Sequence, residues 1–253
     1  MNGTLQLLLG LPLGIILGTL GSLTGIGGGF LLMPLLLWML PDQAPGALSV
    51  ATLTVVFFNA LSGTILSARR ERVRFRTGLT YGLLSLPLVW LGTRLQGMVD
   101  RSAFSLAFGL FLLAGAAFLF FRPPFREVAR PAGRTRWTAG AAISLAVGLV
   151  SGFFGVGGGF LFVPLLAFVL RFPMVEATAT SQLIVGLGAA WALGTGALSH
   201  PLPVNPLLLS GMVAGVLVGA PLGTSAAGRW SPVLVLRILA GLLVIVGMRF
   251  LWS

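Results

Sequence analysis

Long apolar runs without charge dominate this sequence and restrict the folds that it can adopt. Eight such runs are bounded by arginines, prolines or polar clusters, at roughly residues 4–40, 47–67, 78–93, 102–121, 137–170, 177–199, 205–227 and 231–248. A helix needs about 20 mostly apolar residues to cross a membrane. The runs lack the apolar–polar alternation of a membrane barrel, and lipid offers no partner for an unpaired backbone. The sequence therefore predicts an all-α integral membrane protein with about eight transmembrane segments.

The composition excludes a water-soluble fold. Of the 253 residues 57% are hydrophobic and 8% are charged, whereas a soluble domain carries about 25% charged residues. The sixteen basic residues are all arginine, and they outnumber the five acidic residues to give a net charge of +11. We expect no nucleic-acid partner, because the arginines lie between apolar runs and do not form a patch on a polar surface. Cysteine is absent and His200 is the one histidine, so we expect neither a metal site nor a cofactor.

Two basic segments predict the orientation of the chain in the membrane. Residues 68–77 and residues 122–136 each contain five arginines. Arginine and lysine concentrate in cytoplasmic loops of membrane proteins, so both segments are predicted to be cytoplasmic. We expect a multi-pass protein of the cell (inner) membrane whose partners are the lipid bilayer and a small anionic substrate, with a homodimer as one open possibility.

The chain repeats itself. GIGGGFLLMPLLLWML at 25–40 matches GVGGGFLFVPLLAFVL at 155–170, with the glycine frame and Pro34/Pro164 in register. The runs 4–40 and 137–170 are too long for one straight crossing at about 1.5 Å per residue. We expect each helix to break at its glycine cluster. The repeat predicts three parts: a first transmembrane repeat 1–121, a basic linker 122–136 and a second transmembrane repeat 137–253.

The direction of the second repeat stays open at this stage. If each broken helix crosses the membrane once, the halves are parallel. If each break makes a hairpin, the number of crossings becomes odd and the halves are inverted. Both arrangements keep the two basic segments on the cytoplasmic side, so the arginines do not decide between them.

Broken helices at matching places in two repeats are typical of secondary transporters, whose substrate binds where the breaks meet. Helix N-termini direct free N–H groups at an anion, and glycine lets the backbone approach the ligand closely. The alternatives are close helix packing at the glycines and hydroxyls that bond back to their own helix. The predicted substrate-binding residues are Gly25, Gly27, Gly28, Gly29, Thr52, Asn59, Gly155, Gly157, Gly158, Gly159, Thr180, Ser181 and Gln182.

These motifs resemble those of the TauE/SafE family of sulfite exporters. The resemblance rests on the paired GIGGG/GVGGG…P segments, Ala179-Thr180-Ser181, the basic turn Arg72-Val73-Arg74-Phe75 and the two LGT segments, and it covers about residues 5–250. It implies transport of a small sulfur oxyanion such as sulfite, or of an organosulfonate such as sulfoacetate. The first half departs from the pattern, because Val50-Ala51-Thr52-Leu53 stands where the second half has Ala179-Thr180-Ser181-Gln182.

No acidic residue lies inside a predicted span, although proton-coupled carriers often use a buried carboxylate as a relay. Transport is then uncoupled or driven by exchange, or the proton travels on a weakly acidic substrate such as bisulfite. The same absence argues against an intramembrane enzyme, which needs a nucleophile with a base or paired carboxylates. An anion channel and a carrier of small carboxylates remain alternatives.

Overall fold

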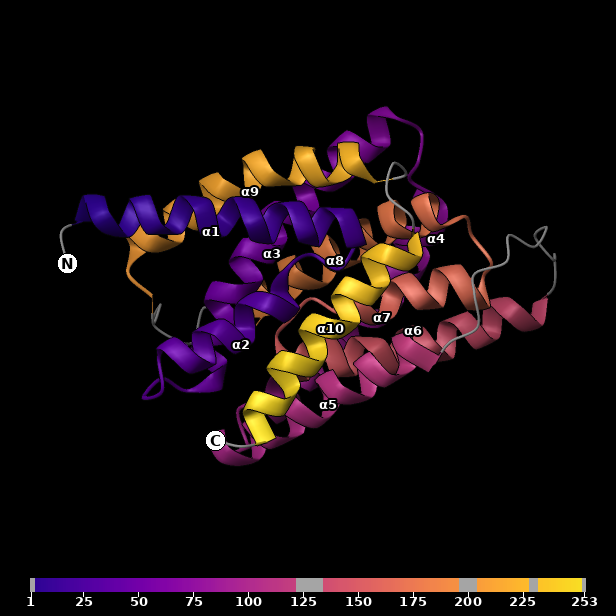
Figure 1. The fold of residues 1–253 in the computed structure, drawn as a ribbon. Helices are drawn as coiled ribbons and strands as arrows, with labels where there is room; N and C mark the ends of the chain where they lie inside the picture. Colours follow the sequence, from indigo (N-terminus) through magenta and orange to yellow (C-terminus); the bar gives the residue numbers. More distant parts are fainter. Residues whose placement is uncertain (1–2, 122–133, 196–203, 228–231, 252–253) are drawn as a thin grey trace.

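Figure 1 shows the chain in a computed structural model, which describes residues 3–121, 134–195, 204–227 and 232–251. Within these ranges every regular element is a helix. The elements are α1 (Gly3–Thr24), α2 (Gly29–Met39), α3 (Pro45–Arg69), α4 (Phe75–Gln96), α5 (Arg101–Phe121), α6 (Arg134–Phe154), α7 (Gly159–Pro164), the π-helical turn η1 (Leu165–Val169), α8 (Met174–Thr195), α9 (Pro206–Ala226) and α10 (Pro232–Leu251). The predicted linker lies outside the described residues except for 134–136, which begin α6.

Among the described residues, five helices are long and apolar enough to cross a membrane. These spans are Leu7–Thr24, Pro45–Arg69, Arg101–Phe118, Trp137–Phe154 and Pro206–Ala226. Large apolar side chains such as Ile16, Leu110 and Leu222 are more than half exposed, which suits contact with lipid tails and is unfavourable in water. The described part of the chain is therefore all-helical, and its long apolar helices indicate a membrane-embedded protein. The other three predicted segments fall on α4, α8 and α10, and the total of eight crossings stays a prediction.

Helices α1 and α9 lie side by side along their length (Figure 1), because glycines on both helices remove side chains from the contact. A Cβ on Gly18 of α1 would stand 2.8 Å from the Cα of Val216, and a Cβ on Gly211 of α9 would stand 2.7 Å from the carbonyl oxygen of Leu7. Such close approach is typical of membrane helices with small residues at their interface. The residue numbers rise together along the contact, so α1 and α9 run in the same direction.

Helices α4 and α6 make a similar pair. The hydroxyl of Ser144 on α6 donates a hydrogen bond of 2.8 Å to the carbonyl oxygen of Tyr81 on α4. One turn further, a Cβ on Gly148 would stand 2.6 Å from the carbonyl oxygen of Ser85. These helices also run in the same direction. Each pair thus joins a helix from the N-terminal part of the chain to one from the C-terminal part.

Helices α3 and α8 cross in the interior and run in opposite directions. A Cβ on Gly186 would stand 3.5 Å from the Cβ of Ala60, and a Cβ on Gly63 would stand 2.6 Å from the Cδ of Gln182. The residue numbers on α3 therefore rise where those on α8 fall. Contacts around Gly109 and Gly247 show the same opposite sense for α5 and α10.

Candidate anion-binding site

Each predicted glycine cluster ends one helix and starts another. α1 ends at Thr24 and α2 begins at Gly29, while α6 ends at Phe154 and α7 begins at Gly159. Three glycines of each cluster have a positive φ, which residues with a side chain rarely adopt: Gly25, Gly27 and Gly28, and Gly155, Gly157 and Gly158. The predicted helix breaks are confirmed, and their backbone geometry explains why they are built from glycine.

The two breaks contact each other reciprocally. A Cβ on Gly29 would stand 2.7 Å from the carbonyl oxygen of Val156, and a Cβ on Gly159 would stand 2.6 Å from the carbonyl oxygen of Ile26. Each glycine thus makes room for the backbone of the opposite break. The structure therefore brings together the two glycine clusters, which are 130 positions apart in the sequence.

The N-terminus of α2 is an uncapped group of donors. Gly28 is its N-cap residue, with a φ of 77°, and no side chain accepts a hydrogen bond from the first turn. The first N–H groups of a helix have no partner within the helix, and they carry a partial positive charge. α7 also begins uncapped, after Gly158, but it has only 6 residues whereas α2 has 11. The first break is therefore the stronger candidate for holding an anion.

Three buried polar side chains gather at the end of α1. They are Ser22 of α1, Asn59 of α3 and Gln182 of α8, and none is more than 1% exposed. The Ser22 hydroxyl donates to Asn59 Oδ1 at 3.0 Å, and Gln182 Nε2 donates to the Ser22 carbonyl oxygen at 3.3 Å. Asn59 Nδ2 and Gln182 Oε1 have no hydrogen-bond partner. The cluster thus keeps one unpaired amide donor and one unpaired carbonyl acceptor.

The unpaired donor of Asn59 faces the start of α2. A Cβ on Gly21 would stand 2.6 Å from Asn59 Nδ2 and equally 2.6 Å from the backbone nitrogen of Gly28. Both nitrogens therefore crowd the same point beside Gly21, and only a residue without a side chain fits there. A side-chain amide and a helix N-terminus therefore converge, which is an arrangement that binds oxyanions without a positively charged residue.

Two further predicted side chains contact other groups. The Ser181 hydroxyl donates to the carbonyl oxygen of Gly25 at 2.7 Å, which ties α8 to the first break. The Thr52 hydroxyl donates to the carbonyl oxygen of Leu48 at 3.0 Å, within its own helix. Ser181 therefore helps to hold the backbone of the first break in place. Thr52 fits the alternative stated above, in which a hydroxyl bonds back to its own helix.

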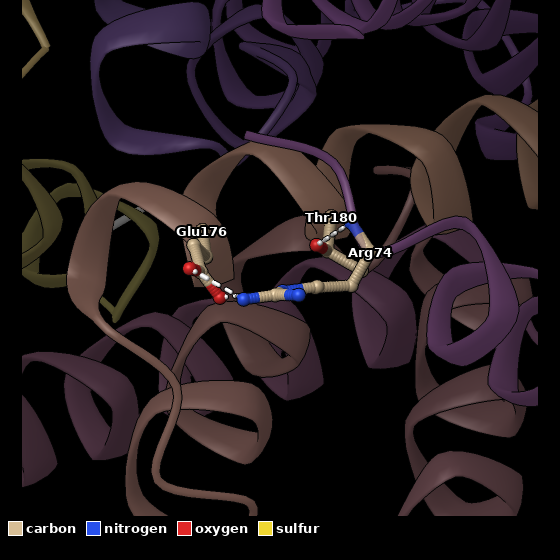
Figure 2. Close-up of polar contacts among 3 residues, drawn as sticks. All are labelled: Arg74, Glu176 and Thr180. Carbon is tan, nitrogen blue, oxygen red and sulfur yellow. Dashed lines mark hydrogen bonds and ion pairs between the residues drawn. The ribbon is translucent and has the colours of Figure 1, made fainter. Parts of the chain in front are cut away.

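Thr180 belongs to a contact between the basic turn and α8 (Figure 2). Its hydroxyl accepts a hydrogen bond of 3.0 Å from the backbone nitrogen of Arg74. The Arg74 guanidinium pairs with Glu176 at 2.8 and 2.9 Å, and this hydrogen bond raises the pKa of Arg74 above its ordinary value. Together these contacts bind the turn after α3 to the first turns of α8, so both lie at the same end of the helices.

The second break lacks the polar cluster of the first. Gly27 and Gly157 pack against the same two side chains, Val56 of α3 and Val185 of α8, which identifies these valines as matching positions. We align Val56 with Val185, and Gly27 with Gly157. In this alignment the positions that match Ser22, Asn59 and Gln182 in the other half are Gly152, Gly188 and Leu53. The cluster of Ser22, Asn59 and Gln182 is therefore specific to the first break, although the backbone of the two breaks is similar and other polar side chains lie against the second.

Ser22 is a residue of the candidate site that the sequence analysis missed. It lies three residues before Gly25, inside the apolar run 4–40, where length and glycine content are the most prominent features. Its position within one turn of the break is the signal in the sequence that marks it. Ser49 was missed in the same way: it lies against Gly155 and accepts a hydrogen bond of 2.8 Å from Gln96 Nε2.

Comparison with known proteins gives a consistent result. A family model described as sulfite exporter TauE/SafE matches residues 10–250. A probable membrane transporter protein of Bacillus subtilis, YunE, is 28% identical over 95% of this chain and 96% of its own. One from Xylella fastidiosa strain Temecula1 is 31% identical over 94% of this chain and 91% of its own. No solved structure matches. The chain is therefore a membrane transporter that belongs to the TauE/SafE sulfite exporter family.

Proposed function

We propose that this chain is a secondary transporter that moves sulfite or an organosulfonate such as sulfoacetate across the cytoplasmic membrane. The observation that carries the proposal is the unpaired Asn59 amide beside the uncapped N-terminus of α2. Neutral N–H donors can hold an anion where a buried, unpaired arginine would be very costly. Membership in a transporter family implies that the chain is not an enzyme. A small carboxylate would meet the same donors and is the alternative substrate class.

We also propose that residues 1–121 and 137–253 are inverted copies joined by the linker 122–136, so that each break makes a hairpin and the number of crossings in each half is odd and not four. The opposite directions of α3 and α8, and of α5 and α10, support inversion, as do the reciprocal contacts of the breaks. The Arg74–Glu176 pair is consistent with it, since inversion places the start of α8 on the same cytoplasmic face as the basic turn 68–77. Movement of inverted halves against each other would expose the breaks to the two sides in turn.

Cysteine labelling tests the inversion, because the chain has no cysteine of its own. Asp42→Cys lies between α2 and α3, and Pro173→Cys lies just before α8. In intact cells a membrane-impermeant maleimide should label position 42 only, and position 173 should react after permeabilisation. Glu71→Cys in the basic turn is the cytoplasmic control. Labelling of 42 and 173 from the same side would refute the inverted arrangement.

Uptake into proteoliposomes tests the transport function. The purified protein is assayed with sulfite, sulfoacetate and small carboxylates, and then with Asn59→Ala and Ser22→Ala. Loss of the Asn59 donor should reduce uptake at least about tenfold, because a buried hydrogen bond to a charged ligand is lost. Thr54→Val is the matched control on α3, since the Thr54 hydroxyl bonds only to the carbonyl oxygen of Val50 in its own helix. Uptake by Asn59→Ala at the control rate would remove Asn59 from the site.

The same vesicles separate a carrier from a channel. A carrier that binds its substrate at a closed site shows counterflow: unlabelled substrate inside the vesicle accelerates entry of labelled substrate. Ser22, Asn59 and Gln182 are all buried here, as a carrier requires of its occluded state. Flux that ignores internal substrate would favour the channel.

A further inference from the structure

We propose that the site at the first break binds its anion in a protonated form, as a monoanion that carries acceptor oxygens together with one O–H group. The inference rests on the proposed anion transport, and it narrows the substrate from sulfite or an organosulfonate to a protonated oxyanion such as hydrogensulfite. It comes from the unpaired acceptor in the cluster, which a fully deprotonated anion cannot satisfy.

The orientation of the Gln182 amide leaves an acceptor unpaired. Gln182 Nε2 donates to the carbonyl oxygen of Ser22 at 3.3 Å. The reversed amide would bring two carbonyl oxygens together, so the nitrogen belongs on this side. Gln182 Oε1 then points the other way, toward Gly63, where the lack of a side chain leaves room for the amide. This oxygen is buried and has no partner, and an acceptor in that position requires a donor.

The donor and the acceptor lie on the same side of α3. Asn59 and Gly63 are four residues apart, which places them one turn apart on one helix face. The Gln182 amide packs on Gly63, and both amides bond to Ser22. A ligand at the break therefore meets two N–H donors, from Asn59 and Gly28, and one C=O acceptor, from Gln182.

This set matches a protonated oxyanion. Two oxygens of such an ion accept hydrogen bonds from Asn59 Nδ2 and the Gly28 N–H, while its O–H donates to Gln182 Oε1. A sulfonate or a doubly charged oxyanion would place an oxygen against the Gln182 carbonyl, where both atoms are acceptors. The site thus favours anions that carry a proton. An anion without an O–H group would leave the buried Gln182 oxygen unpaired, and this strongly disfavours its binding.

The polar cluster itself contains no titratable side chain within the part of the chain that the structure describes. Among the described residues, no titratable side chain has a hydrogen bond to Ser22, Asn59 or Gln182. The described acids lie in turns or at helix ends: Asp42, Glu71, Asp100 and Glu176. A proton on the ligand would therefore cross the membrane with it, and one bound anion would carry one proton.

Uptake of labelled sulfite as a function of pH tests the inference. Total sulfite is held constant while the external pH changes, so that only the fraction present as hydrogensulfite varies. Uptake should follow that fraction and fall about tenfold per pH unit once sulfite is mostly doubly charged. Methanesulfonate, which has a similar shape but no ionisable O–H in this range, should compete at least about tenfold more weakly. A pH-sensitive dye inside the vesicles should report acidification with hydrogensulfite.

The Gln182→Met variant tests whether the Gln182 carbonyl causes the preference for hydrogensulfite over methanesulfonate, because methionine is similar in length and lacks the carbonyl. It should reduce hydrogensulfite uptake about tenfold and leave methanesulfonate unchanged or improved. Asn59→Asp, which keeps an acceptor for Ser22, should abolish uptake of both anions, and a thermal melt confirms that each variant is folded. Equal uptake of the two anions, or equal loss of both in Gln182→Met, would overturn the inference and leave anion transport standing. Uptake of no anion at all would overturn both.

Discussion

The contact between α1 and α9 can be tested with a single methyl group. At Gly18 a Cβ would stand 2.8 Å from the Cα of Val216, 3.0 Å from its carbonyl oxygen and 3.1 Å from the nitrogen of Ala220. All three atoms are backbone, so no side chain can rotate away. Gly18→Ala must separate the two helices by several tenths of an ångström. Because α1 leads directly into the first break, this separation would also disturb the site.

The size of the effect follows from two opposing terms. Overpacking of a tight contact costs about 1–3 kcal/mol, and replacing glycine by alanine inside a helix returns about 1 kcal/mol. Gly194→Ala on α8 isolates the second term, because no atom lies within 4 Å of its Cβ position. With roughly 2–4 °C per kcal/mol for a chain of this size, Gly18→Ala should melt about 0–8 °C below the wild type and about 2–12 °C below Gly194→Ala. Gly194→Ala should melt at the wild-type temperature or slightly above it.

Thermal unfolding of the purified protein in one detergent, followed by tryptophan fluorescence, measures this difference. The two variants carry the same chemical change, so the difference between them reports the contact alone. If Gly18→Ala melts together with Gly194→Ala, then α1 does not lie against α9 at this distance. The parallel pairing of these two helices would then be wrong.

Three further outcomes follow from other contacts. Gly159→Ala places a methyl group 2.6 Å from the carbonyl oxygen of Ile26, so it should reduce transport more strongly than it reduces expression. Unchanged uptake in vesicles would contradict the contact between the breaks. Arg74→Glu should lower the melting temperature, and the double variant with Glu176→Arg should recover part of the loss. The effect is small, since the ion pair is partly exposed and worth about 1 kcal/mol or less. No recovery in the double variant would show that the ion pair does not form. Arg101 donates to two carbonyl oxygens at the end of α2 and in the turn after it, so Arg101→Ala should increase the reaction of a cysteine at position 42 with maleimide, and an unchanged rate would argue against the contact.

Local features of the molecule were predictable from the sequence. The apolar runs identify membrane helices because every backbone group in lipid must be paired within its own segment. The glycine clusters identify the breaks because the backbone there adopts a positive φ at Gly28 and Gly158. Both arguments need only neighbouring residues. The glycine clusters correctly predict where α1 ends and α2 begins, and where α6 ends and α7 begins.

The composition of the candidate site was only partly predictable. Asn59 and Gln182 were identified as polar groups inside apolar runs, and the structure brings them together on Ser22. Thr52 and Thr180 were identified by the same reasoning, yet their hydroxyls bond to the helix backbone and to Arg74. Hydropathy does not tell which way a side chain faces, so the four residues looked alike in the sequence.

The amino-acid pattern is enough to establish that the chain is helical, lies in a membrane and contains two similar glycine breaks. The three-dimensional contacts were needed to show that α1 pairs with α9 and α4 with α6, that α3 and α8 run in opposite directions, and that Ser22, Asn59 and Gln182 gather at the first break. These features depend on contacts between residues far apart in the sequence, from 37 positions for Ser22 and Asn59 to 160 positions for Ser22 and Gln182. Their partners are selected by shape and hydrogen bonding after the helices have formed, and no local pattern records them.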